Sequence, residues 1–268
     1  MAYEILVLDI DGTLTNSQKT ISKKTLRSLY TIQERGKKVV LASGRPTPGI
    51  TKLAEELKLQ EYGGYILAFN GAKIIDCSNQ EVIFQQTIPN NLIPDLYQAA
   101  IDNQVGIITY KKNKIIAGTK IDSYMEIEAK VTQMKLKNVE NFAEYIDIDV
   151  NKCLMTGKPE RMAKVEHILS KQFGSILNIF RSEPYFLEIM PQNIDKAHSL
   201  SILLDHLGLS KEQMISCGDG FNDLSMIQYA GMGVAMANAQ EVVKEAADYI
   251  TLSNDEDGIA HVISQFMM

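Results

Sequence analysis

The sequence contains few residues of the kinds that cross-link a chain or hold zinc. Its 268 residues include three cysteines, Cys77, Cys153 and Cys217, and four histidines. The cysteines are odd in number and far apart, which excludes both a disulfide framework and a cysteine-based zinc site. His198 and His206 lie eight residues apart, and this spacing favours positions on a helix surface over a metal-binding pair.

The sequence also lacks an excess of positive charge and a long apolar run. The formal net charge of −6 argues against a nucleic acid or an anionic membrane as a partner. No apolar run approaches the ~20 residues that a membrane-spanning helix needs. The N-terminal residues lead directly into an apolar segment that ends in acidic residues, so we expect no cleaved signal and a cytoplasmic protein. Nothing in the composition favours one oligomeric state.

The apolar segment near the N-terminus, residues 5–8, is followed by Asp9, Asp11, Gly12 and Thr13. Four consecutive apolar residues are typical of a strand buried on both faces in a parallel sheet. Ligands of such sheets bind at the carboxyl ends of the strands, where Asp9 and Asp11 stand. Two neighbouring acids need a cation or a proton to coexist. Oxygen ligands without nearby His or Cys favour magnesium over zinc.

Two further strand ends follow in the first third of the chain. A helical pattern over residues 22–35 leads to an apolar strand at 39–42, which ends in Ser43, Gly44 and Arg45. A right-handed crossover between the two strands would place Ser43 beside Asp9. Its hydroxyl group and the neighbouring amides suit a phosphoryl oxygen. A third strand over 65–69 ends at Asn70-Gly71, which favours a tight hairpin turn into residues 73–76.

The pattern changes over residues 84–189, where several strands and two or more helices lack ends that look catalytic. This pattern predicts a separate α+β module, and the chain length suits two domains. The module carries scattered cations that favour a solvated surface over a site for a second anionic group, namely Lys111, Lys112, Lys114, Arg161 and Arg181.

The remaining chain adds a lysine and two more carboxylates. Lys196 precedes a helical pattern that ends at Gly208. The strand over 214–217 then runs into Gly218-Asp219-Gly220-Phe221-Asn222-Asp223. Asp219 and Asp223 therefore lie at another strand end, and the flanking glycines permit a turn that other residues make with difficulty.

These four segments in this order resemble the motifs of the haloacid dehalogenase superfamily, and Arg45-Pro46 resembles its Cof-type branch. The resemblance implies an α/β fold, with a doubly wound parallel-sheet, Rossmann-like core formed by residues 1–83 and 190–268. It implies that residues 84–189 are an inserted α+β cap domain. The activity implied is that of a magnesium-dependent phosphatase for a small phosphorylated metabolite, such as a sugar phosphate.

The resemblance also implies roles for individual residues. Asp9 would be the nucleophile that forms an aspartyl-phosphate. Asp11 would be the general acid and base, and would need a pKa near the working pH. Phosphoryl oxygens would be bound by Ser43, Gly44 and Lys196.

The magnesium ion would be held by Asp9, the main-chain carbonyl of Asp11 and Asp219, with Asp223 as a further ligand or support. Weaker candidates for substrate binding are Arg45, Asn70 and Asn222.

Other readings of the motifs differ in chemistry. Asp11 argues against a dehalogenase, because a halide leaves without a proton, and P-type ATPases carry Thr at that position. Phosphosugar mutases keep both acids, so phosphoryl transfer to a second hydroxyl group stays open. A module that binds a phosphorylated metabolite without turnover is the non-enzymatic alternative.

Overall fold

The computed structural model describes residues 2–268. The chain divides into two compact units, one formed by Met1–Phe84 with Asp195–Met268 and the other by Gln85–Ile194. The junctions lie one and five residues beyond those expected at 83/84 and 189/190. The larger shift arises because strand β11 (Phe186–Pro191) continues as a buried strand past residue 189.

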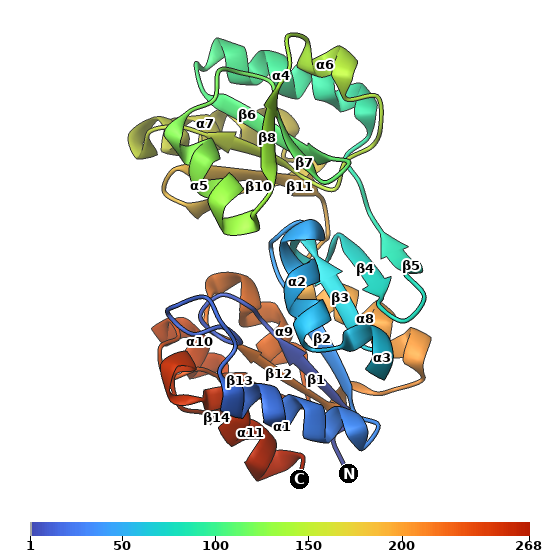
Figure 1. Ribbon diagram of the computed structural model, residues 1–268. Coiled ribbons are helices and arrows are strands. Elements are labelled where there is room, and N and C mark those ends of the chain that lie inside the picture. Colours follow the sequence, from blue (N-terminus) through green and yellow to red (C-terminus); the bar gives the residue numbers. More distant parts are fainter. Residues whose placement is uncertain (1) are drawn as a thin grey trace. The chain divides into compact units, whose positions relative to one another are not determined.

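The first unit contains an eight-stranded sheet in the order β14-β13-β12-β1-β2-β3-β4-β5 (Figure 1). Five parallel strands lie inside the sheet and are largely buried, because most of their residues are apolar. They are β1 (Ile5–Leu8), β2 (Lys38–Ala42), β3 (Tyr65–Ala68), β12 (Met214–Gly218) and β13 (Met232–Ala235). Strand β14 (Tyr249–Ile250) pairs parallel with β13 and forms a partly exposed edge of the sheet.

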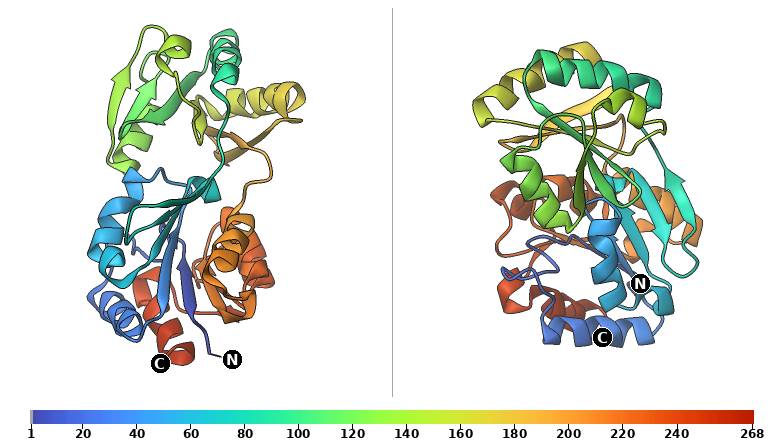
Figure 2. Two further views of the ribbon diagram at one scale, coloured as in Figure 1. Left: turned by 90° about the vertical axis from the view of Figure 1, so that its right-hand side faces the viewer. Right: turned by 45° about the horizontal axis from the view of Figure 1, so that its top comes forward.

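Helices cover both faces of this sheet. Helices α1 (Lys23–Glu34) and α2 (Pro48–Glu56) lie on one face and α8 (Lys196–Leu207) lies on the other (Figure 2). The unit also contains α3 (Leu59–Tyr62), α9 (Leu224–Tyr229), α10 (Glu241–Ala246) and α11 (Gly258–Phe266). The predicted doubly wound core is therefore confirmed.

Helix α1 shows how the sequence sets these boundaries. Ser22 accepts a hydrogen bond from the Thr25 amide and so caps the helix before Lys23. Gly36, at φ +84°, makes the turn that leads into β2. His198 and His206 lie exposed on α8, as their spacing predicted.

The hairpin expected after β3 is present, but its connection is longer than a two-residue turn. Strand β4 (Lys73–Asp76) pairs antiparallel with β3, with Ala68 opposite Lys73. Residues 69–72 join the strands, and Phe69, Asn70 and Gly71 all have positive φ values. Strand β5 (Val82–Gln85) then forms the sheet edge before the second unit begins.

The second unit contains a six-stranded, mainly antiparallel sheet in the order β10-β11-β9-β6-β7-β8. Besides β11, its strands are β6 (Gly106–Lys111), β7 (Lys114–Ala117), β8 (Lys135–Asn138), β9 (Cys153–Thr156) and β10 (Leu177–Glu183). Its helices are α4 (Ile93–Asp102), α5 (Ser123–Thr132), α6 (Phe142–Tyr145) and α7 (Pro159–Phe173).

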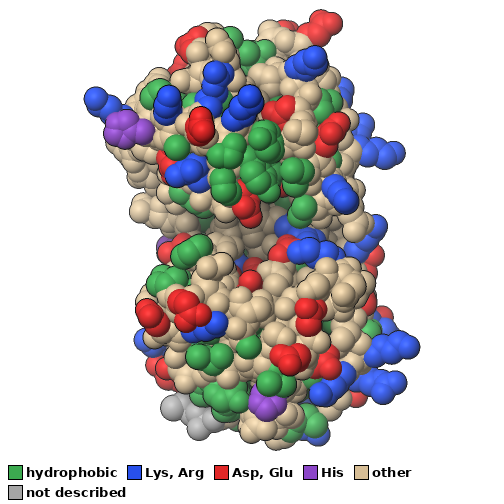
Figure 3. Space-filling model, turned by 90° about the vertical axis from the view of Figure 1, so that its left-hand side faces the viewer, with side chains coloured by type: hydrophobic (Ala, Val, Ile, Leu, Met, Phe, Trp, Pro, Cys, Tyr) green, Lys and Arg blue, Asp and Glu red, His purple; other side chains and the backbone are tan. Residues whose placement is uncertain are grey.

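Charged side chains of both signs are interspersed over the molecular face in Figure 3. Arg161 and Arg181 are paired within their own unit, with the oxygen atoms of Gln104 and the carboxylate of Glu166. Among residues 2–268, no helix combines the length and apolar character that crossing a bilayer requires.

Candidate active site

The acidic residues of the first and fourth motifs meet at one edge of the core sheet. Strands β1 and β12 are parallel neighbours, with Leu8 opposite Cys217, so Asp9 and Asp219 emerge from adjacent strand ends. Asp9, Asp219 and Asp223 each offer a carboxylate oxygen, and the three atoms lie within 4.8 Å of one another. Asp9 is 6% exposed and Asp223 is fully buried.

Lys196 enters this cluster from the first turn of α8. Asp195 caps the helix by accepting a hydrogen bond from the His198 amide, which fixes Lys196 as the first helical residue. The buried ammonium group donates to Asp9 Oδ1 at 2.7 Å, Asp223 Oδ1 at 2.5 Å and the carbonyl oxygen of Ala42 at 2.8 Å. All three of its donor positions are therefore used.

The cluster has more negative than positive charge. Burial raises the pKa of Asp9, the charge of Asp223 raises it further, and Lys196 opposes both, which leaves a pKa of about 8. Burial likewise raises the pKa of Asp219 to about 6, against a hydrogen bond from Thr13. Burial alone would lower the pKa of Lys196, but the charges of Asp223 and Asp9 outweigh it and raise the pKa. Three carboxylates beside one ammonium group fit a divalent cation with hard oxygen ligands.

Backbone and hydroxyl groups orient the two acids of the fourth motif. Asp223 Oδ2 accepts hydrogen bonds from the amides of Asp219 and Gly220, at 2.9 and 2.8 Å. Thr13 Oγ1 donates to Asp219 Oδ1 at 2.8 Å. Gly12 has φ +88°, and a Cβ atom there would lie 2.3 Å from Asp219 Oδ2. Glycine is thus required at position 12 by both its backbone angle and the nearby carboxylate.

Ser43 lies at the end of β2 with its hydroxyl group at the same sheet edge. It is buried, its amide donates to the carbonyl oxygen of Leu67, and its carbonyl oxygen accepts from the Asn70 amide. The Arg45 amide donates to Ser43 Oγ at 3.2 Å. This contact uses the oxygen as an acceptor and leaves the hydroxyl proton to be donated to a phosphoryl oxygen. A Cβ atom at Gly44 would lie 3.1 Å from Asn70 Oδ1.

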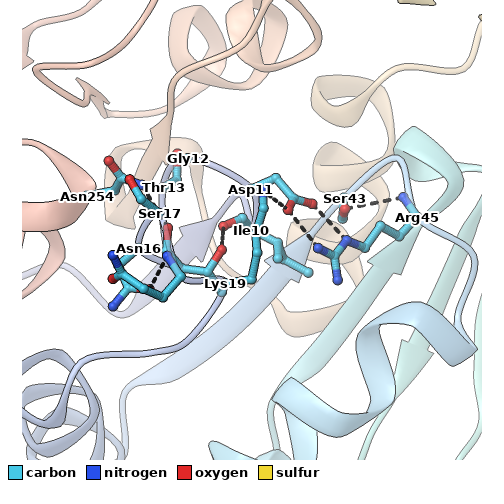
Figure 4. A network of polar contacts seen from close by, with 12 residues as sticks. Ile10, Asp11, Gly12, Thr13, Asn16, Ser17, Lys19, Ser43, Arg45 and Asn254 are labelled. Atoms are coloured by element: carbon cyan, nitrogen blue, oxygen red, sulfur yellow. Dashed lines mark hydrogen bonds and ion pairs between the residues drawn. The ribbon is translucent and has the colours of Figure 1, made fainter. Parts of the chain in front are cut away.

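The Asp11 side chain points toward Arg45 (Figure 4). Arg45 donates from Nε to Oδ2 at 2.7 Å and from Nη2 to Oδ1 at 2.6 Å, and Lys19 Nζ donates to Oδ1 at 2.8 Å. Burial alone would raise the pKa of Asp11, but Arg45 and then Lys19 outweigh it and lower the pKa below its usual value. This direction differs from the expectation of an Asp11 pKa near the working pH.

The weaker candidates for substrate binding fall into two groups. Asn222 Nδ2 donates to Asn70 Oδ1 at 3.1 Å, so these two residues lie together. Beside them Phe221 is 70% exposed. Arg45 belongs instead with Asp11, and its side chain is only 13% exposed.

Two residues that contact the acidic side chains of the site were not identified as such from the sequence. Thr13 was noted as part of the first motif, and a hydroxyl group directly after a turn glycine was a usable signal for a supporting role. Lys19 gave no signal, because it is a single lysine in a polar loop. Its backbone has a left-handed conformation, with φ +60°, and its side chain contacts Asp11.

Comparisons with known proteins identify relatives along nearly the whole chain. A family model described as haloacid dehalogenase-like hydrolase matches residues 6–263. YxeH of Bacillus subtilis, which bears the name of a candidate phosphatase, is 30% identical over 99% of each chain.

Solved structures give the same result. A haloacid dehalogenase-like hydrolase from Bacteroides thetaiotaomicron is 49% identical, with a TM-score of 0.95 over 98% of this chain and 99% of that one. A sugar phosphatase of HAD subclass IIB is 28% identical, with a TM-score of 0.83 over 98% of each chain.

Proposed function

The chain belongs to the haloacid dehalogenase-like hydrolases and is a phosphatase, and from this premise we propose how it works and on what. It removes the phosphoryl group from a small phosphorylated metabolite of the sugar-phosphate type. The reaction uses Mg²⁺ and passes through an aspartyl-phosphate on Asp9. The sugar phosphatase among its structural relatives supports this substrate class.

The arrangement of Lys196 between Asp9 and Asp223 carries the proposal. A buried ammonium group 2.7 Å from Asp9 Oδ1 offsets the charge of the nucleophile and of an incoming phosphoryl group. Ser43 stands at the next strand end with a hydroxyl proton to donate to a phosphoryl oxygen, and Gly44 follows it. The strand ends thus supply a nucleophile and donors for the charge that develops on phosphorus.

In the first step, a carboxylate oxygen of Asp9 forms a bond to phosphorus as the bond to the leaving oxygen breaks. The leaving oxygen takes a proton from Asp11 and departs as an alcohol. Because Arg45 and Lys19 favour the ionised form of Asp11, the residue must take up a proton before this step.

In the second step, a water oxygen attacks the phosphorus atom and the bond between phosphorus and Asp9 breaks. The water proton passes to Asp11, for which the ionised form is the suitable starting state. Inorganic phosphate leaves, and Asp9 is regenerated.

The charges of the site fit a magnesium ion. Asp9, Asp219 and the main-chain carbonyl of Asp11 would hold the ion, with Asp223 supporting the loop. When bound, Mg²⁺ supplies two positive charges that offset the carboxylates and the phosphoryl oxygens.

The test is phosphate release from p-nitrophenyl phosphate and a panel of sugar phosphates, with Mg²⁺ and with EDTA. Turnover is expected only with the metal, and Asp9→Asn is expected to abolish it. Asp205→Asn, at an exposed position on α8, is the matched control and keeps full activity. Turnover that persists in Asp9→Asn would rule out the aspartyl-phosphate route.

A further inference from the structure

The acceptor positions of Asp11 are used unequally. A carboxylate offers about four lone-pair positions, two on each oxygen. Oδ1 accepts from Arg45 Nη2 and from Lys19 Nζ, so both of its positions are used. Among the described residues, Oδ2 accepts one hydrogen bond, from Arg45 Nε. One position therefore remains on Oδ2 to exchange a proton with a reacting oxygen.

Arg45 is itself held in place by its surroundings. Its Nη1 donates to the carbonyl oxygen of Gly49 at 3.1 Å, and its amide donates to Ser43 Oγ. Two of its three side-chain nitrogens face Asp11, and the third faces the backbone. A side chain held in this way makes a bidentate contact that fixes the orientation of a carboxylate.

Lys19 reaches Asp11 from a closed turn. Its amide donates to the carbonyl oxygen of Asn16, and the Asn16 side chain accepts from the amides of Gln18 and Thr20. The Lys19 side chain is 62% exposed, so solvent screens its charge more than that of Arg45.

We propose that Arg45, assisted by Lys19, is a positioning residue that presents Oδ2 of Asp11 to the reacting oxygen. Arg45 acts on the reaction through Asp11 and does not bind the substrate. The inference rests on the proposed function, in which Asp11 transfers the proton.

The test compares two leaving groups. A sugar hydroxyl needs a proton to depart, whereas p-nitrophenolate is stable without one. In Arg45→Gln, kcat/KM for the best sugar phosphate, which reports the steps up to formation of the aspartyl-phosphate, is expected to fall about 10- to 100-fold, a fraction of what a general acid contributes. KM is expected to change less than about 3-fold, and kcat/KM for p-nitrophenyl phosphate to stay within about 3-fold.

A double-mutant cycle with Asp11→Asn separates the two possible roles of Arg45. If Arg45 acts through Asp11, adding Arg45→Gln to Asp11→Asn lowers kcat for the sugar phosphate no further. An equal loss in both backgrounds overturns the inference, as does a rise in KM at constant kcat, which indicates a substrate contact. Equal losses of kcat/KM on both substrates overturn it too, because p-nitrophenolate does not need a proton from Asp11 in the first step.

Three further variants separate the role of Arg45 from a general loss of structure. Arg45→Lys keeps the charge but loses the bidentate contact. Like Arg45→Gln, it is expected to lose activity on the sugar phosphate and to keep activity on p-nitrophenyl phosphate. Lys19→Met is expected to show this difference more weakly, while exposed Arg27→Gln leaves both substrates unaffected. Absence of turnover by the wild-type protein would overturn the proposed function together with the inference. Turnover with an additive cycle would overturn the inference alone.

Discussion

Lys196 Nζ lies 2.7 Å from Asp9 Oδ1, although 187 residues separate the two in the chain. The contact joins the end of β1 to the start of α8, and both side chains are buried. The contact affects both stability and chemistry, because the ammonium group lowers the pKa of Asp9 against burial and the charge of Asp223, which raise it.

Removing this ammonium group should destabilise the protein. Lys196→Met leaves Asp9 and Asp223 buried without their cationic partner, and breaking such pairs costs about 3–5 kcal/mol. We expect a loss of that size in the free energy of unfolding, measured by urea denaturation, and no phosphatase activity. Lys23→Met, exposed on α1, is the control. A stability equal to that of the control would contradict the account.

Adding one methyl group at Gly12 should damage the metal site. Gly12→Ala places Cβ 2.3 Å from Asp219 Oδ2 at φ +88°, so the carboxylate must shift. Gly36→Ala has a similar φ of +84° and nothing within 4 Å of the added carbon. The control should lose about 1 kcal/mol from backbone strain alone.

The two glycine variants are to be compared by thermal unfolding and by Mg²⁺ titration. Gly12→Ala should lose more stability than Gly36→Ala and bind Mg²⁺ more weakly. Equal effects of the two substitutions would show that the approach of Asp219 to Gly12 is unimportant.

Thr13→Val should weaken metal binding with little change in shape. It removes the hydrogen bond from Thr13 Oγ1 to Asp219 Oδ1, and loss of such a supporting contact typically lowers metal affinity by about 10- to 100-fold. Isothermal titration calorimetry with Mg²⁺ measures the change. Thr51→Val, in the exposed part of α2, should bind Mg²⁺ as the wild type does.

Stabilisation by Mg²⁺ should increase with pH. The pKa of Asp9 is raised to about 8 and that of Asp219 to about 6. The metal-free folded state therefore retains protons that the unfolded state releases. It incurs no penalty below about pH 4 and an increasing one as the pH rises toward 8. Mg²⁺ displaces these protons and relieves the penalty.

The corresponding experiment records Tm with Mg²⁺ and with EDTA at several values between about pH 5 and pH 8. The increase in Tm caused by Mg²⁺ should be small at the low end and larger at the high end. A shift in Tm that does not vary with pH would show that protons and Mg²⁺ do not compete for these carboxylates.

Elements with a strong apolar signal could be predicted from the sequence. The strand ends at Asp9 and Ser43 follow unbroken apolar runs, and the one at Asp219 follows an apolar run interrupted by Ser216. The structure brings all three to one sheet edge. Strand β8 was missed because three of its four residues are polar. Helix α6 was missed because a four-residue helix has no periodicity to detect.

The environment of Asp11 could not be predicted in the same way. Its pairing with Arg45 links residues 34 positions apart through side-chain orientation, and no spacing rule encodes that orientation. A residue that acts as both acid and base was expected to have a pKa near the working pH, and Arg45 was a weak candidate for binding the substrate. The structure shows the two side chains in contact with each other, and the Arg45 contact lowers the pKa of Asp11.

The interruption of the core by residues 85–194 bears on how the protein is made. Strand β1 lies between β2 and β12, so its second edge stays unpaired on the ribosome until Met214–Gly218 has been synthesised. The inserted unit is continuous in sequence and can fold while the second edge of β1 is still unpaired. Chains arrested before residue 214 should therefore contain a protease-resistant fragment near residues 85–194, beside a cleavable N-terminal segment that needs protection from aggregation.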